Sequence, residues 1–132
     1  MLLIDESYNA KPASMAATLR SLGAEQVGGR RIAVLGPMRE LGAHSAELHA
    51  GLAPAVREAH VDELILIGDE MRPLAEKVIG NISLDIVSSV DEATEALRRK
   101  VRPGDAVLVK ASNSVGLAKL VESMAKEPAC ST

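Results

Sequence analysis

Aromatic residues are almost absent from this sequence, and their absence limits what the core can contain. Tyr8 is the only aromatic residue among 132, and there is no Trp or Phe. Hydrophobic residues nevertheless make up 47% of the chain, which excludes a disordered protein. A core of Val, Ile, Leu, Met and Ala favours a sheet covered by helices over an all-β sandwich, whose strands are usually rich in aromatic residues and Thr.

Cysteine and long apolar runs are scarce as well. Cys130 is the only cysteine and lies in a short polar tail, residues 126–132, so an internal disulfide and a Cys-based metal site are excluded. No apolar run approaches the ~20 residues of a membrane span. The apolar start of the chain meets Asp5 and Glu6 at once, unlike a signal peptide. We therefore expect a cytoplasmic protein without membrane insertion.

The chain also lacks an excess of positive charge. Its net charge is -3, from 15 basic and 18 acidic residues spread along the sequence. The densest basic cluster falls at the end of an expected helix, where it complements the helix dipole; it consists of Arg98, Arg99, Lys100 and Arg102. Without a basic stripe, nucleic acid is not an expected partner.

Short apolar runs alternate with segments of helical spacing along the whole chain. The runs cover residues 2–4, 32–35, 64–67, 82–87 and 106–109, and the helical segments cover 15–22, 48–56, 71–78, 93–101 and 117–124. Four runs are continuous, as in parallel strands buried on both faces, whereas the alternating run 82–87 is expected nearer an edge. The pattern predicts one doubly wound, Rossmann-like α/β domain over residues 1–132, with five or six mostly parallel strands and about five helices in three layers.

Local signals agree with these helices. Pro12 suits a first helical turn, and Ser89 with Glu92 forms a capping box. Gly23 and Gly80 are expected to follow helix ends.

Ligands of open parallel sheets bind beyond the carboxyl ends of the strands. Polar and small residues follow four of the expected strands, at 5–12, 36–42, 68–72 and 110–114, whereas Gly104 and Asp105 at the opposite rim suggest a simple turn. Lys110 directly follows four buried apolar residues, so its side chain either faces a ligand or extends to solvent. This rim is the expected binding site.

Several nucleotide, metal and catalytic motifs are missing. No Gly-x-Gly-x-x-Gly follows a strand, and the Gly-rich phosphate loop that ends in Gly-Lys-Ser/Thr is absent. His44 and His49 are five residues apart, off a shared helical face, so we expect them and His60 to be surface or capping residues rather than metal ligands. From the residues alone the chain is a ligand-binding α/β domain without catalytic residues or a metal site.

Three stretches carry a more specific resemblance. Residues 5–15 read Asp-Glu-Ser-Tyr-Asn-Ala-Lys-Pro-Ala-Ser-Met, and residues 34–42 read Val-Leu-Gly-Pro-Met-Arg-Glu-Leu-Gly, followed by Ser-Ala-Glu-Leu-His at 45–49. Residues 109–114, Val-Lys-Ala-Ser-Asn-Ser, form a third and weaker match. The three lie in order over nearly the whole chain. They resemble the C-terminal domain of Mur ligases, in particular those that add D-alanyl-D-alanine to UDP-N-acetylmuramoyl-tripeptide in peptidoglycan synthesis.

The resemblance implies one domain of a cytoplasmic three-domain ligase. A first domain would hold the UDP-sugar, and a central domain would carry ATP and Mg2+. The family activates the tripeptide carboxylate as an acyl phosphate, which the amine of the dipeptide attacks. The third domain would supply proximity and exclude water, and would be inactive and monomeric alone. Its partners would be D-alanyl-D-alanine, the UDP-muramoyl tripeptide and the central ATPase domain.

The resemblance also implies site residues. Ser7, Tyr8 and Asn9 would face the central domain and its nucleotide. A second set would lie near the incoming dipeptide, namely Met38, Glu40, Leu41, Lys110, Ser112 and Asn113.

This chain departs from the family pattern at three positions. Lys11 stands where the family usually has Asn, Ala111 stands where it has Gly, and Asn113 replaces an Arg suited to a carboxylate. Lys110 or Arg72 are the candidates to supply the missing charge.

One alternative belongs to another class, the response-regulator receiver domain. Receiver domains have paired acids after the first strand, an Asp at the third and a Lys after the fifth. The residues of this chain that resemble this set are Asp5, Glu6, Asp69, Ser88 and Lys110. Against it, Asp69 follows Gly68 instead of ending a strand, and receivers have no need of residues 38–42.

Overall fold

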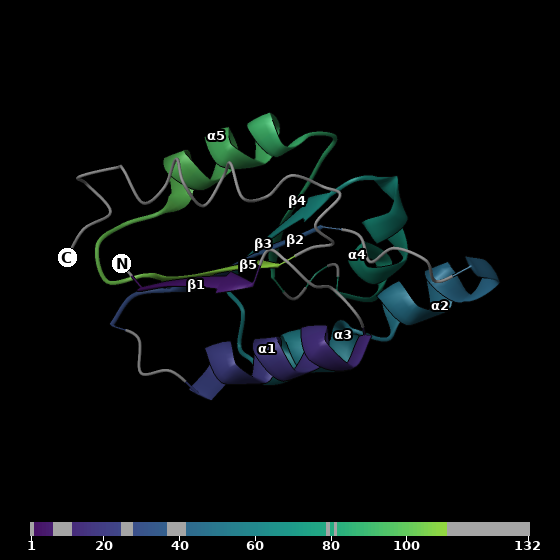
Figure 1. Cartoon of the computed structure of the whole chain (residues 1–132). Coiled ribbons are helices and arrows are strands. Elements are labelled where there is room, and N and C mark those ends of the chain that lie inside the picture. Colours follow the sequence, from purple (N-terminus) through teal and green to yellow (C-terminus); the bar gives the residue numbers. More distant parts are fainter. Residues whose placement is uncertain are drawn as a thin grey trace.

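A parallel sheet forms the centre of the molecule (Figure 1). The computed structural model describes residues 2–6, 12–24, 28–36, 42–78, 80 and 82–110. Within them lie the strands β1 (Leu2–Glu6), β2 (Arg31–Leu35), β3 (Glu63–Ile67), β4 (Ser83–Val87) and β5 (Ala106–Lys110). Their order is β1-β5-β2-β3-β4, and every pair is parallel.

The strand order explains why helices cover both faces. From β1 to β4 the chain always advances in one direction across the sheet, and then returns to place β5 between β1 and β2. Because crossovers between parallel strands are right-handed, a reversal of direction moves the connecting helix to the other face. Accordingly α1 (Pro12–Ala24), α3 (Ala53–Glu58) and α4 (Arg72–Val78) cover one face, and α5 (Val90–Lys100) lies on the other (Figure 1).

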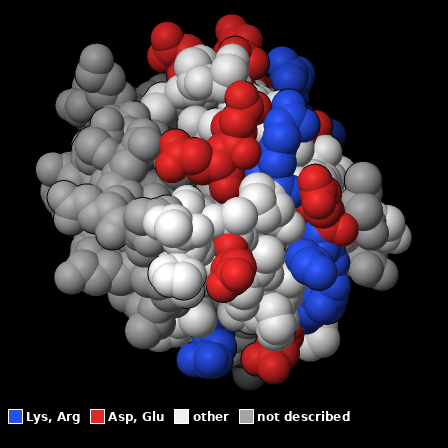
Figure 2. All heavy atoms as spheres, turned by 90° about the vertical axis from the view of Figure 1, so that its right-hand side faces the viewer, with Lys and Arg blue, Asp and Glu red and all other residues white. Residues whose placement is uncertain are grey.

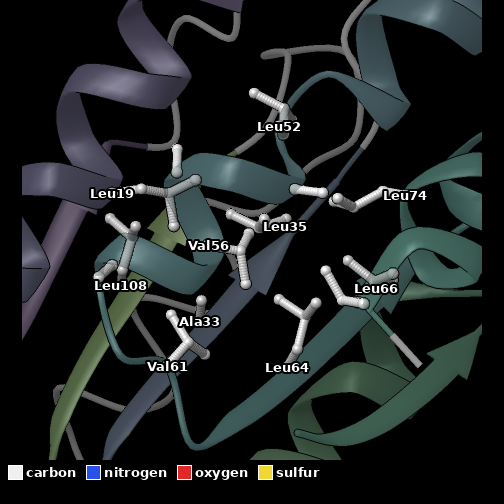
Figure 3. Packing of buried hydrophobic residues seen from close by; sticks show 14 of the residues in the cluster. Leu19, Ala33, Leu35, Leu52, Val56, Val61, Leu64, Leu66, Leu74 and Leu108 are labelled. Carbon is white, nitrogen blue, oxygen red and sulfur yellow. The ribbon is translucent and has the colours of Figure 1, made fainter. Parts of the chain in front are cut away.

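Alternation along the strands divides the core into two clusters. Ala33, Leu35, Leu64, Leu66 and Leu108 pack against α1, α3 and α4 (Figure 3). Their sequence neighbours face α5, and these are Ile32, Val34, Ile65, Ile67, Val107 and Val109. The continuous apolar runs of β2, β3 and β5 are therefore buried on both faces, as the sequence predicts.

The prediction of a single helix over residues 48–56 is wrong, because the chain forms two short helices there. The chain forms a 3-10 turn η1 (Gly42–His44), then α2 (Ser45–Ala50), and resumes as α3 after Gly51 and Leu52. Pro54 has no N–H to donate to the carbonyl four residues earlier, and Leu52 instead donates to the His49 carbonyl at 3.2 Å. Leu52 and Val56 are still buried on one side, so the predicted face is confirmed.

Other local predictions are confirmed. Strand β4 lies at the edge of the sheet. Pro12 begins α1, and the Ser89 hydroxyl accepts from the Glu92 N–H at 3.1 Å to cap α5. Gly23 lies within the last turn of α1 rather than after it, where a Cβ would meet the Ala59 Cα at 2.7 Å. The five strands within the described residues agree with the predicted five or six, and the helix expected over 117–124 and the tail 126–132 lie outside those residues.

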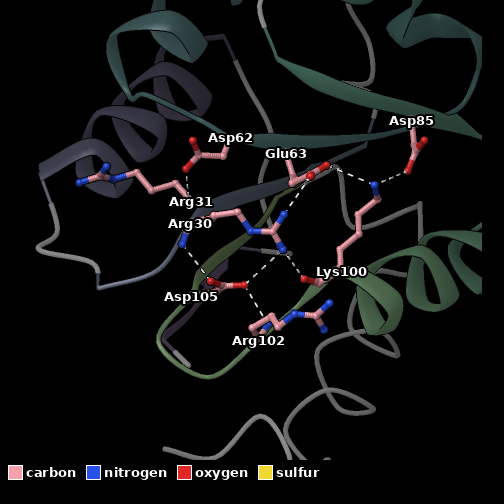
Figure 4. Close-up of polar contacts among 8 residues, drawn as sticks. All are labelled: Arg30, Arg31, Asp62, Glu63, Asp85, Lys100, Arg102 and Asp105. Carbon is pink, nitrogen blue, oxygen red and sulfur yellow. Dashed lines mark hydrogen bonds and ion pairs between the residues drawn. The ribbon is translucent and has the colours of Figure 1, made fainter.

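The amino-terminal edge of the sheet, where the parallel strands begin, is more elaborate than the simple turn expected there. Asp105 is 2% exposed and accepts hydrogen bonds from the backbone N–H groups of Arg30 and Arg102, both at 2.8 Å (Figure 4). Glu63 binds Arg30 at 3.0 Å and Lys100 at 3.2 Å. The Lys100 ammonium also lies 3.2 Å from Asp85. The sequence prediction missed this network because its members are far apart along the chain.

Candidate functional site

The three sequence stretches that follow β1, β2 and β5 leave the sheet from adjacent strands. β5 lies between β1 and β2, and its last residue, Lys110, is in register with Glu6 on one side and Leu35 on the other. The Gly36 N–H extends the ladder, donating to the Lys110 carbonyl at 2.9 Å. The strand ends that lead into residues 7–9, 37–41 and 111–113 therefore stand side by side, and the site that these residues would form stays a prediction.

Lys110 is buried within this edge. It is 2% exposed, so of the two alternatives left open by the sequence, the one in which the side chain extends to solvent is wrong. Alternation along β5 places it on the same face as Ala106 and Leu108, which pack against the α1 and α3 layer. A buried ammonium is costly unless it is paired, and Lys110 does have a polar partner within the fold.

The end of β3 adds the next part of the edge. Gly68 has φ +94°, a conformation that favours glycine, and turns the chain into the 3-10 turn η2 (Asp69–Met71). Asp69 and Arg72 form an exposed ion pair at 3.1 Å. Figure 2 faces this end of the molecule, and on its described part basic side chains lie mainly along the right-hand side, interspersed with acidic ones that also occupy the top, centre and bottom.

His49 is a residue of this region that the sequence prediction misjudged. It is fully buried in α2, not a surface or capping residue, and its Nδ1 lies 2.7 Å from the Ser45 carbonyl oxygen. The spacing of His49, Leu52 and Val56, at i, i+3 and i+7, was the signal that it shares the apolar face. His44 and His60 are exposed, as expected.

The remaining predicted site residues lie outside the described residues. These are Ser7, Tyr8, Asn9, Met38, Glu40, Leu41, Ser112 and Asn113, together with the departures Lys11 and Ala111. Among the residues that the structure does describe, no group of three or more His, Cys, Asp or Glu side chains comes close enough to hold a metal ion. In the same part of the chain, no helix is long and apolar enough to cross a membrane.

Comparison with known families decides between the interpretations. The model of the family described as "Mur ligase, glutamate ligase domain" matches residues 1–113. The chain belongs to the Mur ligase family. The receiver alternative is wrong, and the strand order agrees: receiver domains have the order 2-1-3-4-5, whereas here β5 lies between β1 and β2.

Two relatives of this Mur ligase domain have the same name. The UDP-N-acetylmuramoyl-tripeptide--D-alanyl-D-alanine ligase of Synechocystis is 36% identical over 128 residues, which cover 96% of this chain and 28% of that protein. The ligase of the same name from Mycobacterium leprae is 36% identical and covers 91% of this chain. The chain thus spans less than a third of the length of these relatives.

A solved structure has the same fold. The MurF ligase from Thermotoga maritima, in complex with ADP, superposes with a TM-score of 0.72 at 26% identity, over 91% of this chain and 27% of that one. The prediction of a Rossmann-like Mur ligase domain is therefore confirmed at the level of the family and the fold.

Proposed function

We propose that this chain is the C-terminal domain of a ligase that joins D-alanyl-D-alanine to UDP-N-acetylmuramoyl-tripeptide. The observation that carries the proposal is the row of strand ends Glu6, Lys110 and Leu35, which brings the three family-like stretches to one edge of the sheet. The names of the relatives support the substrates. The ADP in the Thermotoga maritima structure supports ATP as the energy source.

In this proposal the domain works by proximity. It holds the dipeptide amine near the activated tripeptide carboxylate and keeps water from an acyl phosphate that water would hydrolyse. ATP and Mg2+ are assigned to the central domain of the longer protein, so no step through the metal is assigned to residues of this chain. Lys110, Ser112 and Asn113 are proposed to receive the dipeptide carboxylate, with Met38, Glu40 and Leu41 beside them.

Lys110 has the main part in this arrangement. Lys110 is buried at the end of the strand between β1 and β2, and we propose that its positive charge attracts the dipeptide carboxylate to this edge. The Arg expected at position 113 is replaced by Asn, so Lys110 is the charge that the proposal relies on. Ser7, Tyr8 and Asn9 are proposed to contact the central domain and its nucleotide on closure.

The proposal is tested with the full-length protein that contains this chain. We expect phosphate release from ATP only when UDP-N-acetylmuramoyl-tripeptide and D-alanyl-D-alanine are both present, with the joined product seen by mass spectrometry. The 132-residue chain alone should show no turnover. Use of a single amino acid in place of the dipeptide, or turnover by the isolated chain, would contradict the proposal.

The cytoplasmic location and the monomeric state also remain predictions. Gel filtration of the isolated chain with light scattering tests the second, and a dimer mass would show it to be wrong.

A further inference from the structure

Strand β4 ends the strand order, so no other strand within the described residues lies on its outer side. On its inner side the Val87 carbonyl accepts from the Gly68 N–H at 2.8 Å, which directs the backbone groups of Val87 toward β3. The backbone groups of successive residues point alternately to the two sides of a strand. The N–H and C=O groups of Leu84 and Ile86 therefore point away from β3, as in an edge that can accept a further strand.

The side chains of the same two residues line a groove between β4 and α4. Leu84 and Ile86 are half-buried, and together with Ala75 they form the apolar lining of this groove of about 310 Å³. Arg72 and Glu76 are exposed, lie one helical turn apart on α4 and line the groove as well. The groove thus combines an apolar floor with one charge of each sign.

The charge of β4 itself does not guard this groove. Exposed edge strands are commonly protected by charged side chains or by Pro. Asp85 is the one charged residue in the β4 sequence, and its carboxylate lies 3.2 Å from the Lys100 ammonium of α5, on the opposite face of the sheet. An extended chain can therefore approach the groove without burying an unpaired charge of β4.

We propose that this edge binds an extended segment of a partner protein as an additional, antiparallel strand. In this kind of recognition, main-chain hydrogen bonds supply affinity and pockets for alternate side chains supply specificity. The segment has an apolar side chain over Ala75, an acidic residue two positions before it and a basic residue two positions after it. The antiparallel direction is favoured because such pairs are slightly more stable per residue than parallel ones.

The positions of Arg72 and Glu76 set the order of the two partner charges. α4 follows the carboxyl end of β3, which is in register with the carboxyl end of β4, so Arg72 lies near that end and Glu76 farther from it. An antiparallel segment begins at that end, which places its acidic residue beside Arg72 and its basic residue beside Glu76. The partner charges are about 13 Å apart and the two α4 residues about 6 Å apart along the helix, so the long side chains have to span roughly 3–4 Å at each end. The exposed ion pair of Arg72 with Asp69 is a weak competitor.

Fluorescence anisotropy of labelled peptides, added to the full-length protein that contains this chain, tests the proposal. The probe is the blocked peptide Thr-Glu-Thr-Ile-Thr-Lys-Thr, and its counterpart has Glu and Lys exchanged. The probe should bind roughly 3- to 30-fold more tightly, because it makes two favourable exposed charge pairs. The double substitution Arg72→Glu with Glu76→Arg should reverse that preference. The matched control, Glu95→Arg with Arg99→Glu, exchanges charges on exposed residues of α5 and should leave the preference unchanged.

Methylation of single peptide nitrogens tests the strand pairing. In an antiparallel pair, the residues opposite Leu84 and Ile86 exchange hydrogen bonds with them and face the same side of the sheet. N-methylation of the peptide Ile should therefore weaken binding roughly 5- to 10-fold. N-methylation of the Thr that follows it, whose N–H points away from β4, should have little effect, and the opposite pattern would overturn the antiparallel pairing.

Three further results would overturn the proposal. The first is the absence of saturable binding, equal affinity of the wild type for both peptides, or a preference that the Arg72 and Glu76 substitutions do not reverse. The second is binding by the 132-residue chain but not by the full-length protein, which would mean that the longer protein covers this edge itself. The third is a dimer of the full-length protein that the probe dissociates, which would make a second copy the occupant.

Discussion

The two edges of the sheet both carry charged residues, but they use them differently. At the amino-terminal edge the charges are satisfied by one another: Asp105, Arg30, Glu63, Lys100 and Asp85 form a connected set (Figure 4). At the carboxyl edge Lys110 is buried at the point where the family-like stretches leave the sheet. We infer that the first edge stabilises the fold, whereas the second is the edge proposed to serve the ligand, so substitutions should separate stability from activity.

The largest effect is expected at Asp105. Asp105→Ala leaves the N–H groups of Arg30 and Arg102 without their acceptor in a site where the carboxylate is 2% exposed. Each unsatisfied buried donor costs about 1–3 kcal/mol, so with two donors the free energy of unfolding should fall by roughly 2–6 kcal/mol. Urea unfolding of the wild-type and variant 132-residue chains measures this change in the free energy of unfolding. A loss below about 0.5 kcal/mol, the usual size at an unconstrained surface position, would mean that the network does not stabilise this edge.

Lys110 should show the opposite behaviour. A charged hydrogen bond in a closed site contributes ~1.5–3 kcal/mol, so Lys110→Ala in the full-length ligase should weaken use of D-alanyl-D-alanine roughly 10- to 150-fold. The apparent KM of the UDP-tripeptide should hardly change. Lys110→Met, which keeps the length of the side chain and removes the charge, separates charge from packing. Unchanged KM and kcat for the dipeptide in both variants would remove Lys110 from the site.

A smaller effect is expected from pH at the amino-terminal edge. Burial alone would lower the pKa of Lys100, but hydrogen bonds to Glu63 and Asp85 outweigh it and raise the pKa above 10.5. Because the pKa of Lys100 is higher in the folded state than in the unfolded state, its charged form stabilises the fold at pH values below the unfolded-state pKa. This contribution is lost as pH rises through the folded-state pKa. The stability difference between wild type and Lys100→Met should stay constant from about pH 7 to about pH 9 and narrow above 10.5. A difference that widens with pH would reverse this assignment.

The smallest effect is expected at Arg72. Its ion pair with Asp69 is exposed, with side chains 61% and 87% accessible. Such pairs contribute ~0–1 kcal/mol, so Arg72→Ala should change the free energy of unfolding by less than about 0.5 kcal/mol. The KM for the dipeptide should also stay unchanged, because Lys110 and not Arg72 is proposed to supply the positive charge for the dipeptide carboxylate. A rise in that KM comparable with that of Lys110→Ala would favour Arg72 as the carboxylate partner.

Much of the fold follows from local patterns. Continuous apolar runs such as 64–67 predict strands buried on both faces, and the alternating run 82–87 predicts a strand at an edge of the sheet, because each pattern reports how many faces of a strand are covered. The continuous run 2–4 did not predict that β1 ends the other side of the strand order. The single helix over 48–56 is the local failure: Pro54 removes a donor that helical spacing alone does not register.

The candidate site was only partly visible in the sequence. Lys110 stood out because it ends an apolar run, yet its burial depends on what packs over it. His49 was misjudged because its residue type predicts a polar surface, although its spacing matches the apolar face. Asp105 gave no signal, because the N–H group of Arg30 that it accepts from lies 75 residues away along the chain.

By itself, the sequence determined the composition of the core, the alternation of strands and helices, and the family, since each is written in short stretches of consecutive residues. Only the tertiary structure decided that β5 lies between β1 and β2. That choice depends on pairing between segments about 75 to 100 residues apart, as in Leu35 with Lys110 and Glu6 with Lys110, and no local propensity encodes such pairing. Because of it, three stretches that are distant in the chain end at one edge of the sheet, where a single ligand can meet them all.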